Sequence, residues 1–146
     1  MRLQYSLGFT VIDVMIAIAI VAILGATTMP IVHGYLTRGT LESTTQDIVA
    51  ALRYAQIQSE AGVDDAAWGV FVGGGLITLF RGESYTTRAS AYDQTVAYPS
   101  STAITGTIEY VFTKRTGRTS SGTITLTSPS FLTQSIVVNA MGMIDF

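Results

Sequence analysis

Few residues in this chain have the types and spacing that catalysis or metal binding needs. The chain contains no cysteine and one histidine, His33, which excludes cysteine nucleophiles, zinc–thiolate sites and multi-histidine metal sites. A serine–histidine–aspartate triad would have to use His33, which follows a long apolar run and suits a boundary or subunit contact better. The glycines at 73–75 lack the lysine and the strand-to-helix setting of a phosphate loop. We therefore expect a protein that is not an enzyme and that uses no metal or cofactor.

Two small charged clusters remain as candidate sites. Asp64 and Asp65 are adjacent, but calcium takes about six to eight oxygen ligands and the pair lacks the further acids of an EF-hand pattern, which favours a solvated turn. Lys114, Arg115 and Arg118 form the only basic cluster of the sequence. They could give a weak, salt-sensitive contact with DNA phosphates, although a solvated β-turn is the favoured interpretation.

The element that precedes these clusters is an unusually apolar N-terminal segment. Hydrophobic residues make up 48% of the chain and charged residues only 12%. Residues 9–32 carry a single charge, Asp13, and as a helix they would be roughly 36 Å long, enough to cross a bilayer. We therefore expect residues 9–32 to span a membrane. A cleaved secretory signal and an ordinary uncleaved anchor are the alternatives, but neither explains an acid inside the apolar run.

The residues GFTVID at positions 8–13 resemble the cleavage motif of type IV prepilins. In that family a short basic leader ends in glycine, and a membrane-embedded aspartyl peptidase cuts after it and methylates the new N-terminus. The resemblance implies a prepilin leader over residues 1–8, cleavage between Gly8 and Phe9, and N-methylation of Phe9.

Two further positions match the family's assembly features. Pro30 stands where a proline kinks the long helix of pilins. Asp13 stands where the family has a glutamate, which is thought to neutralise the N-terminal amine of a neighbouring subunit during assembly. Aspartate keeps the charge, and a buried lone carboxylate is penalised by several kcal/mol unless it is paired. Its side chain is one methylene shorter, so the tightness of subunit registration stays open.

Beyond the apolar run, a stripe at helical spacing predicts that the helix continues and packs on a sheet. The region 29–39 is a predicted weak point because Gly34 and Gly39 are poor helix formers, and Gly62 is a suitable stop. The stripe consists of Leu41, Thr45, Ile48, Leu52, Ala55 and Ser59.

The rest of the chain reads as short strands. Strands are predicted at 67–73, 76–81, 107–113, 123–128 and 134–140, with shorter ones near 95–98 and at 143–146, and a long loop over 82–106. The expected fold class is α+β: a long N-terminal helix over 9–61, membrane-spanning in its first half, packed on a C-terminal antiparallel β-sheet as in pilins. The expected domains are thus the leader 1–8, the helix 9–61 and an extracytoplasmic β-sheet domain over 63–146.

The C-terminal part of the chain is similar to the GspH/FimT group of minor pilins and pseudopilins. The similarity is carried by YVFTKRTGRTSSGTITLTS at 110–128, SIVVNAMGMIDF at 135–146 and the helix segment DIVAALRYAQIQSEA at 47–61. It implies a minor structural subunit of a type II secretion pseudopilus or a type IV pilus that helps to initiate the filament or form its tip.

The same resemblance implies the partners and the location. The partners are a prepilin peptidase, other pilins or pseudopilins in a helical filament, and an inner-membrane assembly platform. The protein would cross the cytoplasmic (inner) membrane once, before it enters an extracytoplasmic filament. Two alternatives stay open: a DNA-binding minor pilin at a pilus tip, using Lys114, Arg115 and Arg118, and a plain single-pass membrane-anchored domain. The sequence does not separate pilus from pseudopilus or name a cargo.

Overall fold

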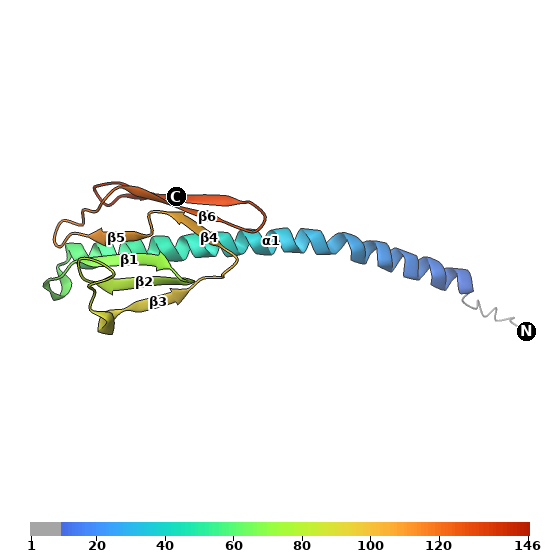
Figure 1. Cartoon of the computed structure of the whole chain (residues 1–146). Helices are drawn as coiled ribbons and strands as arrows, with labels where there is room; N and C mark the ends of the chain where they lie inside the picture. The colour runs from blue at the N-terminus through green and yellow to red at the C-terminus, as the bar shows by residue number, and fades with distance from the viewer. Residues whose placement is uncertain (1–9) are drawn as a thin grey trace, which may run out of the picture. The chain divides into compact units, whose positions relative to one another are not determined.

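The computed structural model describes residues 10–146, the side chains of residues 26–36 excepted. Its first element is the helix α1, Val11–Glu60, of 50 residues (Figure 1). The backbone is helical throughout residues 29–39, where the sequence predicted a weak point. The chain divides into two units, of which the first ends at Leu36 and the second runs from Thr37 to Phe146.

Within the described residues, the second unit contains two four-stranded antiparallel sheets. The first sheet has the order β3-β2-β1-β5 and the second the order β4-β6-β7-β8 (Figure 1). The strands are β1 (Trp68–Gly73), β2 (Leu76–Arg81), β3 (Gln94–Ala97), β4 (Ala103–Gly106), β5 (Glu109–Phe112), β6 (Gly122–Thr127), β7 (Thr133–Val138) and β8 (Ile144–Asp145).

One hydrophobic core joins the C-terminal part of α1 to both sheets. The stripe predicted from residue spacing is confirmed, since all six of its side chains, from Leu41 to Ser59, are buried. The same core takes alternate residues from β1, such as Val70 and Val72, and from β6, such as Ile124 and Leu126. The period-two pattern of the strands therefore turns one face of each sheet toward the helix.

The prediction of a single sheet is wrong, because the chain changes sheets between β3 and β4, between β4 and β5 and between β5 and β6. Gly106 lies at the second of these changes. Gly106 has φ +96°, and a Cβ at this position would lie 2.1 Å from the carbonyl oxygen of Thr123. The next N–H, that of Thr107, still donates to the Thr123 carbonyl at 2.9 Å, while the carbonyl of Ile108 already accepts from Val72 at 2.8 Å. The strand predicted at 107–113 is thus shorter, and of these residues only Glu109–Phe112 form the strand β5 of the first sheet.

The prediction that residues 9–32 span a membrane is also wrong. Among the helices that the described residues form, none combines the length and the apolarity that crossing a membrane requires. The membrane-spanning first half of the helix and the single-pass location in the cytoplasmic membrane are both overturned by this finding.

The segment predicted as a long loop, 82–106, contributes one strand to each sheet, β3 to the first and β4 to the second. It contains β3, β4 and a short 3-10 turn, Ser90–Tyr92. The Tyr85 ring stacks on Phe71 of β1 with centroids 3.9 Å apart, and the guanidinium carbon of Arg88 lies 3.8 Å from the centroid of the Tyr85 ring. The N–H of Tyr85 donates to Oε1 of Glu109 at 2.7 Å, so the segment is fixed to two strands.

Candidate functional site

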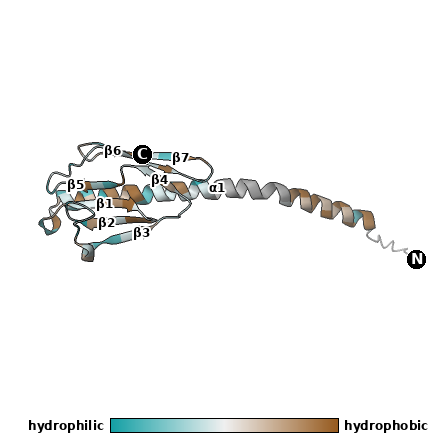
Figure 2. Ribbon diagram, viewed as in Figure 1, coloured by the Kyte–Doolittle hydropathy of each residue, from teal (hydrophilic) through white to brown (hydrophobic). Residues whose placement is uncertain are grey.

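The most unusual surface of the described chain is the apolar helix segment, which we define as residues 11–22 of α1. Its large apolar side chains are all exposed, from 47% for Val14 to 80% for Val11. Figure 2 shows their hydrophobic character on the N-terminal turns of α1. They occupy every face of the helix, a distribution typical of helices that are buried on all sides. The large members are Val11, Ile12, Val14, Met15, Ile16, Ile18, Ile20 and Val21.

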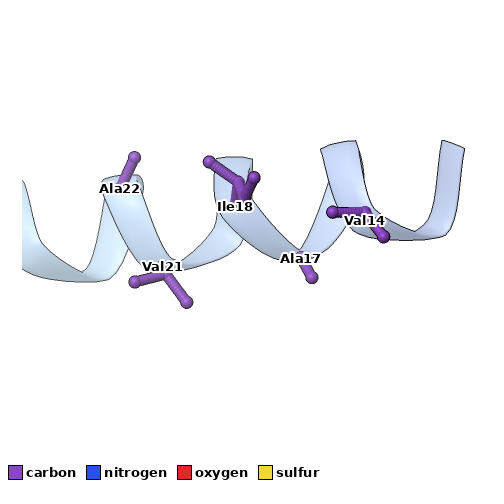
Figure 3. A pocket seen from close by; sticks show the side chains of 5 residues that line it. All are labelled: Val14, Ala17, Ile18, Val21 and Ala22. Carbon is purple, nitrogen blue, oxygen red and sulfur yellow. The ribbon is translucent and has the colours of Figure 1, made fainter. Parts of the chain in front are cut away.

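One face of the apolar helix segment is hollowed into a shallow groove. Val14, Ala17, Ile18, Val21 and Ala22 line it, at the three- and four-residue spacing that places side chains on one helix face (Figure 3). Ala17 and Ala22 carry only a methyl group, so they leave room between the larger side chains of Val14, Ile18 and Val21.

Asp13, the predicted assembly residue, has a local role at the start of α1. Its Oδ2 accepts the N–H of Thr10 at 3.0 Å and the Thr10 hydroxyl at 2.7 Å, while the N–H of Asp13 donates to the Thr10 hydroxyl oxygen at 3.3 Å. This reciprocal arrangement is a capping box. The Thr10 hydroxyl, and after it the Thr10 N–H, lowers the pKa of the Asp13 carboxyl, which is therefore charged at neutral pH.

The other residues of the predicted prepilin motif are less fully described. Gly8 and Phe9, the predicted cleavage and methylation positions, lie outside the described residues. Pro30 lies within the helical backbone of α1, and its side chain, like that of His33, is not among those described. The Thr10–Asp13 pair is the one feature that sequence reasoning missed here, although the spacing of a threonine and an acid three residues later was readable.

The structure brings together the two charged clusters that the sequence presented separately. Nζ of Lys114 lies 2.5 Å and a guanidinium nitrogen of Arg115 lies 3.5 Å from the same oxygen, Oδ1 of Asp65. Asp64 pairs with Arg81 at 3.1 Å. The hydrogen bond and charge of Lys114 lower the pKa of Asp65, with a smaller contribution from Arg115. DNA phosphates would have to compete with Asp65 for two of the three predicted basic contacts, and the third, Arg118, is exposed.

The basic turn also closes the C-terminal end of α1. The carbonyl of Ser59 accepts N–H groups from Gly62 at 3.1 Å and from Arg115 at 2.7 Å. Gly117 lies on Glu60, because a Cβ on that glycine would be 2.3 Å from Oε1 of Glu60. A Cβ on Gly142 would lie 2.5 Å from the carbonyl oxygen of Gly117. The two glycines of the C-terminal resemblance thus meet at the helix end and hold the final turn of the chain there.

Among the side chains that the structure describes, no group of three or more from histidine, cysteine, aspartate and glutamate is arranged to hold a metal ion. No family model, no curated protein and no solved structure matches the chain. The resemblance to prepilins and to the GspH/FimT group therefore stays a prediction.

Proposed function

We propose that this chain is a structural, non-enzymatic subunit of a helical filament of the type IV pilus or type II secretion pseudopilus kind. In such a filament the apolar helix segment would pack against the helices of neighbouring subunits. The observation that carries the proposal is the exposure of large apolar side chains on every face of residues 11–22. Such a surface favours burial in an interface, because monomeric soluble proteins rarely expose contiguous apolar patches of this kind.

The distribution of these side chains favours a bundle over a simple pair of helices. A helix that pairs with one partner needs a single apolar stripe, whereas this segment is apolar all round and needs several neighbours to cover it. Burying one large aliphatic side chain contributes about 1.5–3 kcal/mol, so burying half of the eight would contribute roughly 6–12 kcal/mol. That is similar to the roughly 4–15 kcal/mol lost when two molecules associate, and further neighbours would add to the gain.

The charge at Asp13 fits this proposal. Covering the apolar helix segment would also withdraw Asp13 from water, and a buried carboxylate is stabilised by a cationic partner. The resemblance to prepilins supplies such a partner, the N-terminal amine of a neighbouring subunit. The capping box holds Oδ2 of Asp13 against Thr10, which fixes where that partner must approach.

The role of a minor subunit near the tip is also a proposal, and it rests on the GspH/FimT resemblance of the C-terminal part. DNA binding is a weaker candidate, because Lys114 and Arg115 already pair with Asp65. No observation in the structure favours it over a solvated, ion-paired turn.

The mass of the N-terminal peptide tests the proposal. We would purify the full chain from cells in which a prepilin peptidase visibly processes a known prepilin. The expected peptide begins at Phe9 and carries one additional methyl group, and replacing Gly8 by leucine should leave the leader attached. A wild-type chain that begins at Met1 in those cells would contradict the proposal.

A further inference from the structure

Strand β3 is an exposed, uncharged edge of the first sheet. It lies at one end of the order β3-β2-β1-β5, and all four of its residues, Gln94–Ala97, are exposed (Figure 1). An exposed strand edge is a template for another strand, and proteins often protect it with charges, proline or a bulge. β3 carries no charge and no proline, and it pairs with β2 in an unbroken register. Its outer edge is therefore open to a further strand.

The pairing with β2 determines which backbone groups of β3 point outward. Residues of an antiparallel pair bond in alternation, so every second residue turns its N–H and C=O away from the partner strand. The N–H of Tyr98 donates to the Gly75 carbonyl at 3.0 Å, so Tyr98 and, two residues earlier, Val96 bond toward β2. Thr95 and Ala97 therefore turn their N–H and C=O groups to the outer edge.

The open part of this edge is bounded at both ends. Before β3, the N–H of Asp93 already donates to the Ser90 carbonyl at 3.3 Å. After β3, Pro99 has no N–H, and its carbonyl accepts the N–H of Thr102 at 2.9 Å. The edge thus offers the N–H donors of its two outward residues only, with their two carbonyls beside them.

The other edge strands of the two sheets are less suited to pairing. Beside β5 the chain turns back, because the N–H of Thr113 donates to the Arg118 carbonyl at 2.7 Å. β8 consists of two residues, one of which is the charged Asp145. β4 is as long as β3 but ends in Gly106, whose φ of +96° departs from the extended backbone that a partner strand requires. Among the described strands, β3 therefore has the edge that fits a partner best.

The outward groups of β3 are complementary to those of a second β3. In an antiparallel pair centred on Val96, Thr95 of one chain lies opposite Ala97 of the other. The two outward donors of each strand then meet the two outward carbonyls of its copy, which gives four hydrogen bonds. A two-fold pair brings identical strands together, so charged side chains there would repel their own copies, and β3 has none.

Val96 adds an apolar contact to this pair. Val96 lies beside Ile77 of β2, on the side of the sheet that faces the core. Ile77 is 1% exposed, whereas Val96, one strand further out, is 49% exposed. At the centre of the pair, Val96 of a second chain would lie directly opposite and cover this side chain.

We propose that β3 is a pairing surface for a second copy of this chain, through an antiparallel β3–β3 pair with Val96 on the two-fold axis. The inference goes beyond the proposed function, because it uses the second unit and not the apolar helix segment. Both chains use the same surface, so the contact closes after two copies. It therefore pairs chains without extending a filament.

Disulfide formation tests the pairing, because the chain has no cysteine of its own. The full-length Val96→Cys chain is purified in a mild detergent, which covers the apolar helix segment, and is then oxidised. We expect a reducible dimer, because Cα atoms at such a position are about 4.5 Å apart, within the range that a disulfide spans.

Two exposed positions serve as controls, Thr95→Cys on β3 and Ala103→Cys on β4. In the proposed register the two Thr95 Cα atoms are roughly 8–9 Å apart, too far for a disulfide. Ala103 lies on a strand that the proposal leaves unpaired. Both control chains should therefore give at least tenfold less dimer than Val96→Cys.

Ala97→Pro separates pairing from folding. The N–H of Ala97 points away from β2, so proline at this edge position removes no hydrogen bond within the chain but two of the four between the chains. In the Val96→Cys chain it should reduce the dimer at least tenfold and leave the melting temperature unchanged within a few degrees. Ala97→Val keeps the N–H and is the matched control, which should give as much dimer as Val96→Cys alone.

Several outcomes would overturn the pairing. A dimer that forms equally well with Thr95→Cys or Ala103→Cys, or that survives Ala97→Pro, would mean that oxidation captures random collisions. A Val96→Cys chain that stays monomeric would leave the edge to an extended segment of another protein. Each of these results leaves the filament proposal standing, because the N-terminal peptide and the apolar helix segment test that proposal separately.

Discussion

The backbone carbonyl of Ser59 accepts the N–H of Arg115 at 2.7 Å, so a turn from the second half of the chain caps the C-terminal end of α1. Arg115 has φ +65° there, a left-handed conformation in which its N–H reaches the helix end. Orphan carbonyls at a helix C-terminus require such partners. The basic turn that the sequence singled out for its charge thus has a structural role carried by its backbone.

Ser59→Ala should destabilise the second unit by about 1–3 kcal/mol. The Ser59 hydroxyl is buried and accepts the N–H of Trp68 at 2.9 Å, so alanine would leave that buried N–H without its acceptor. Urea unfolding of the full chain measures the loss. Ser121→Ala, at an exposed position, should change stability by less than about 0.5 kcal/mol. Equal effects for the two variants would show that the Ser59–Trp68 bond contributes nothing.

Gly142→Ala should cost roughly 2–5 kcal/mol of unfolding free energy. Its φ is +84°, which costs an alanine about 1–2 kcal/mol, and the new Cβ would lie 2.5 Å from the Gly117 carbonyl oxygen, which adds about 1–3 kcal/mol of overpacking. Gly74→Ala is the matched control, since Gly74 has φ +62° but open space around it, and it should show the backbone cost alone. Chemical denaturation compares the two, and equal losses would argue against the packed contact between the two glycine turns.

Tyr85→Ala should release the segment that connects β2 and β3. The Tyr85 ring contacts Phe71 and Arg88, and no other ring in the described residues stacks face to face with Phe71. Limited proteolysis should then cut within residues 82–93 at least tenfold faster, whereas Tyr85→Phe keeps the stacked ring and should resist like the wild type. Unchanged cleavage of the alanine variant would mean that Asp93 and Glu109 hold the segment without the ring.

Tyr110 should make stability fall at high pH. Its hydroxyl is buried and makes no hydrogen bond among the described residues. Burial raises the pKa of Tyr110, against a smaller opposing effect of the neighbouring Thr107. The pKa of a tyrosine in the unfolded chain is about 10, and below that pH the contribution of Tyr110 to the free energy of unfolding is complete. The contribution is lost as the pH rises from there through the higher pKa of Tyr110 in the folded chain.

Tyr110→Phe removes both the buried hydroxyl and this titration. Its stability should equal that of the wild type at pH 8 or exceed it by about 1 kcal/mol, and the difference should grow between pH 10 and 11. Urea unfolding across that range measures it, and subtracting the variant's profile cancels the other tyrosines. A constant difference across the range would contradict the raised pKa.

Local sequence patterns predicted the buried helix face and most strands of the second unit. The division of the strands into two sheets was not predicted, because it depends on contacts between residues far apart in the chain. The buried stripe of α1 and the β1–β2 hairpin follow from residue spacing and from Gly74 and Gly75, which both have positive φ in the observed turn. The change of sheet after β4 takes place at Gly106, which lies against the Thr123 carbonyl, a contact that no local pattern encodes. The strand at 103–106 was missed because its partner, β6, lies about 20 residues away.

The candidate site shows the same division. The exposed apolar run and Asp13 were visible in the sequence, and the Thr10–Asp13 capping box could have been read from its spacing. The pairing of Asp65 with Lys114 could not, because it joins residues about 50 positions apart.

The most direct test of the filament proposal compares the wild type with Ile16→Asp in filaments sheared from cells that assemble them. Ile16 is 54% exposed in the single chain, so the variant should fold and accumulate normally, as should the control Ser121→Asp. Packing of the helices would bury an unpaired carboxylate, which costs several kcal/mol. Each 1.4 kcal/mol of that cost weakens the association tenfold. We expect the wild type and the control in the filament fraction, with Ile16→Asp depleted at least tenfold. Absence of the wild type from that fraction, or equal recovery of Ile16→Asp, would contradict the proposed function.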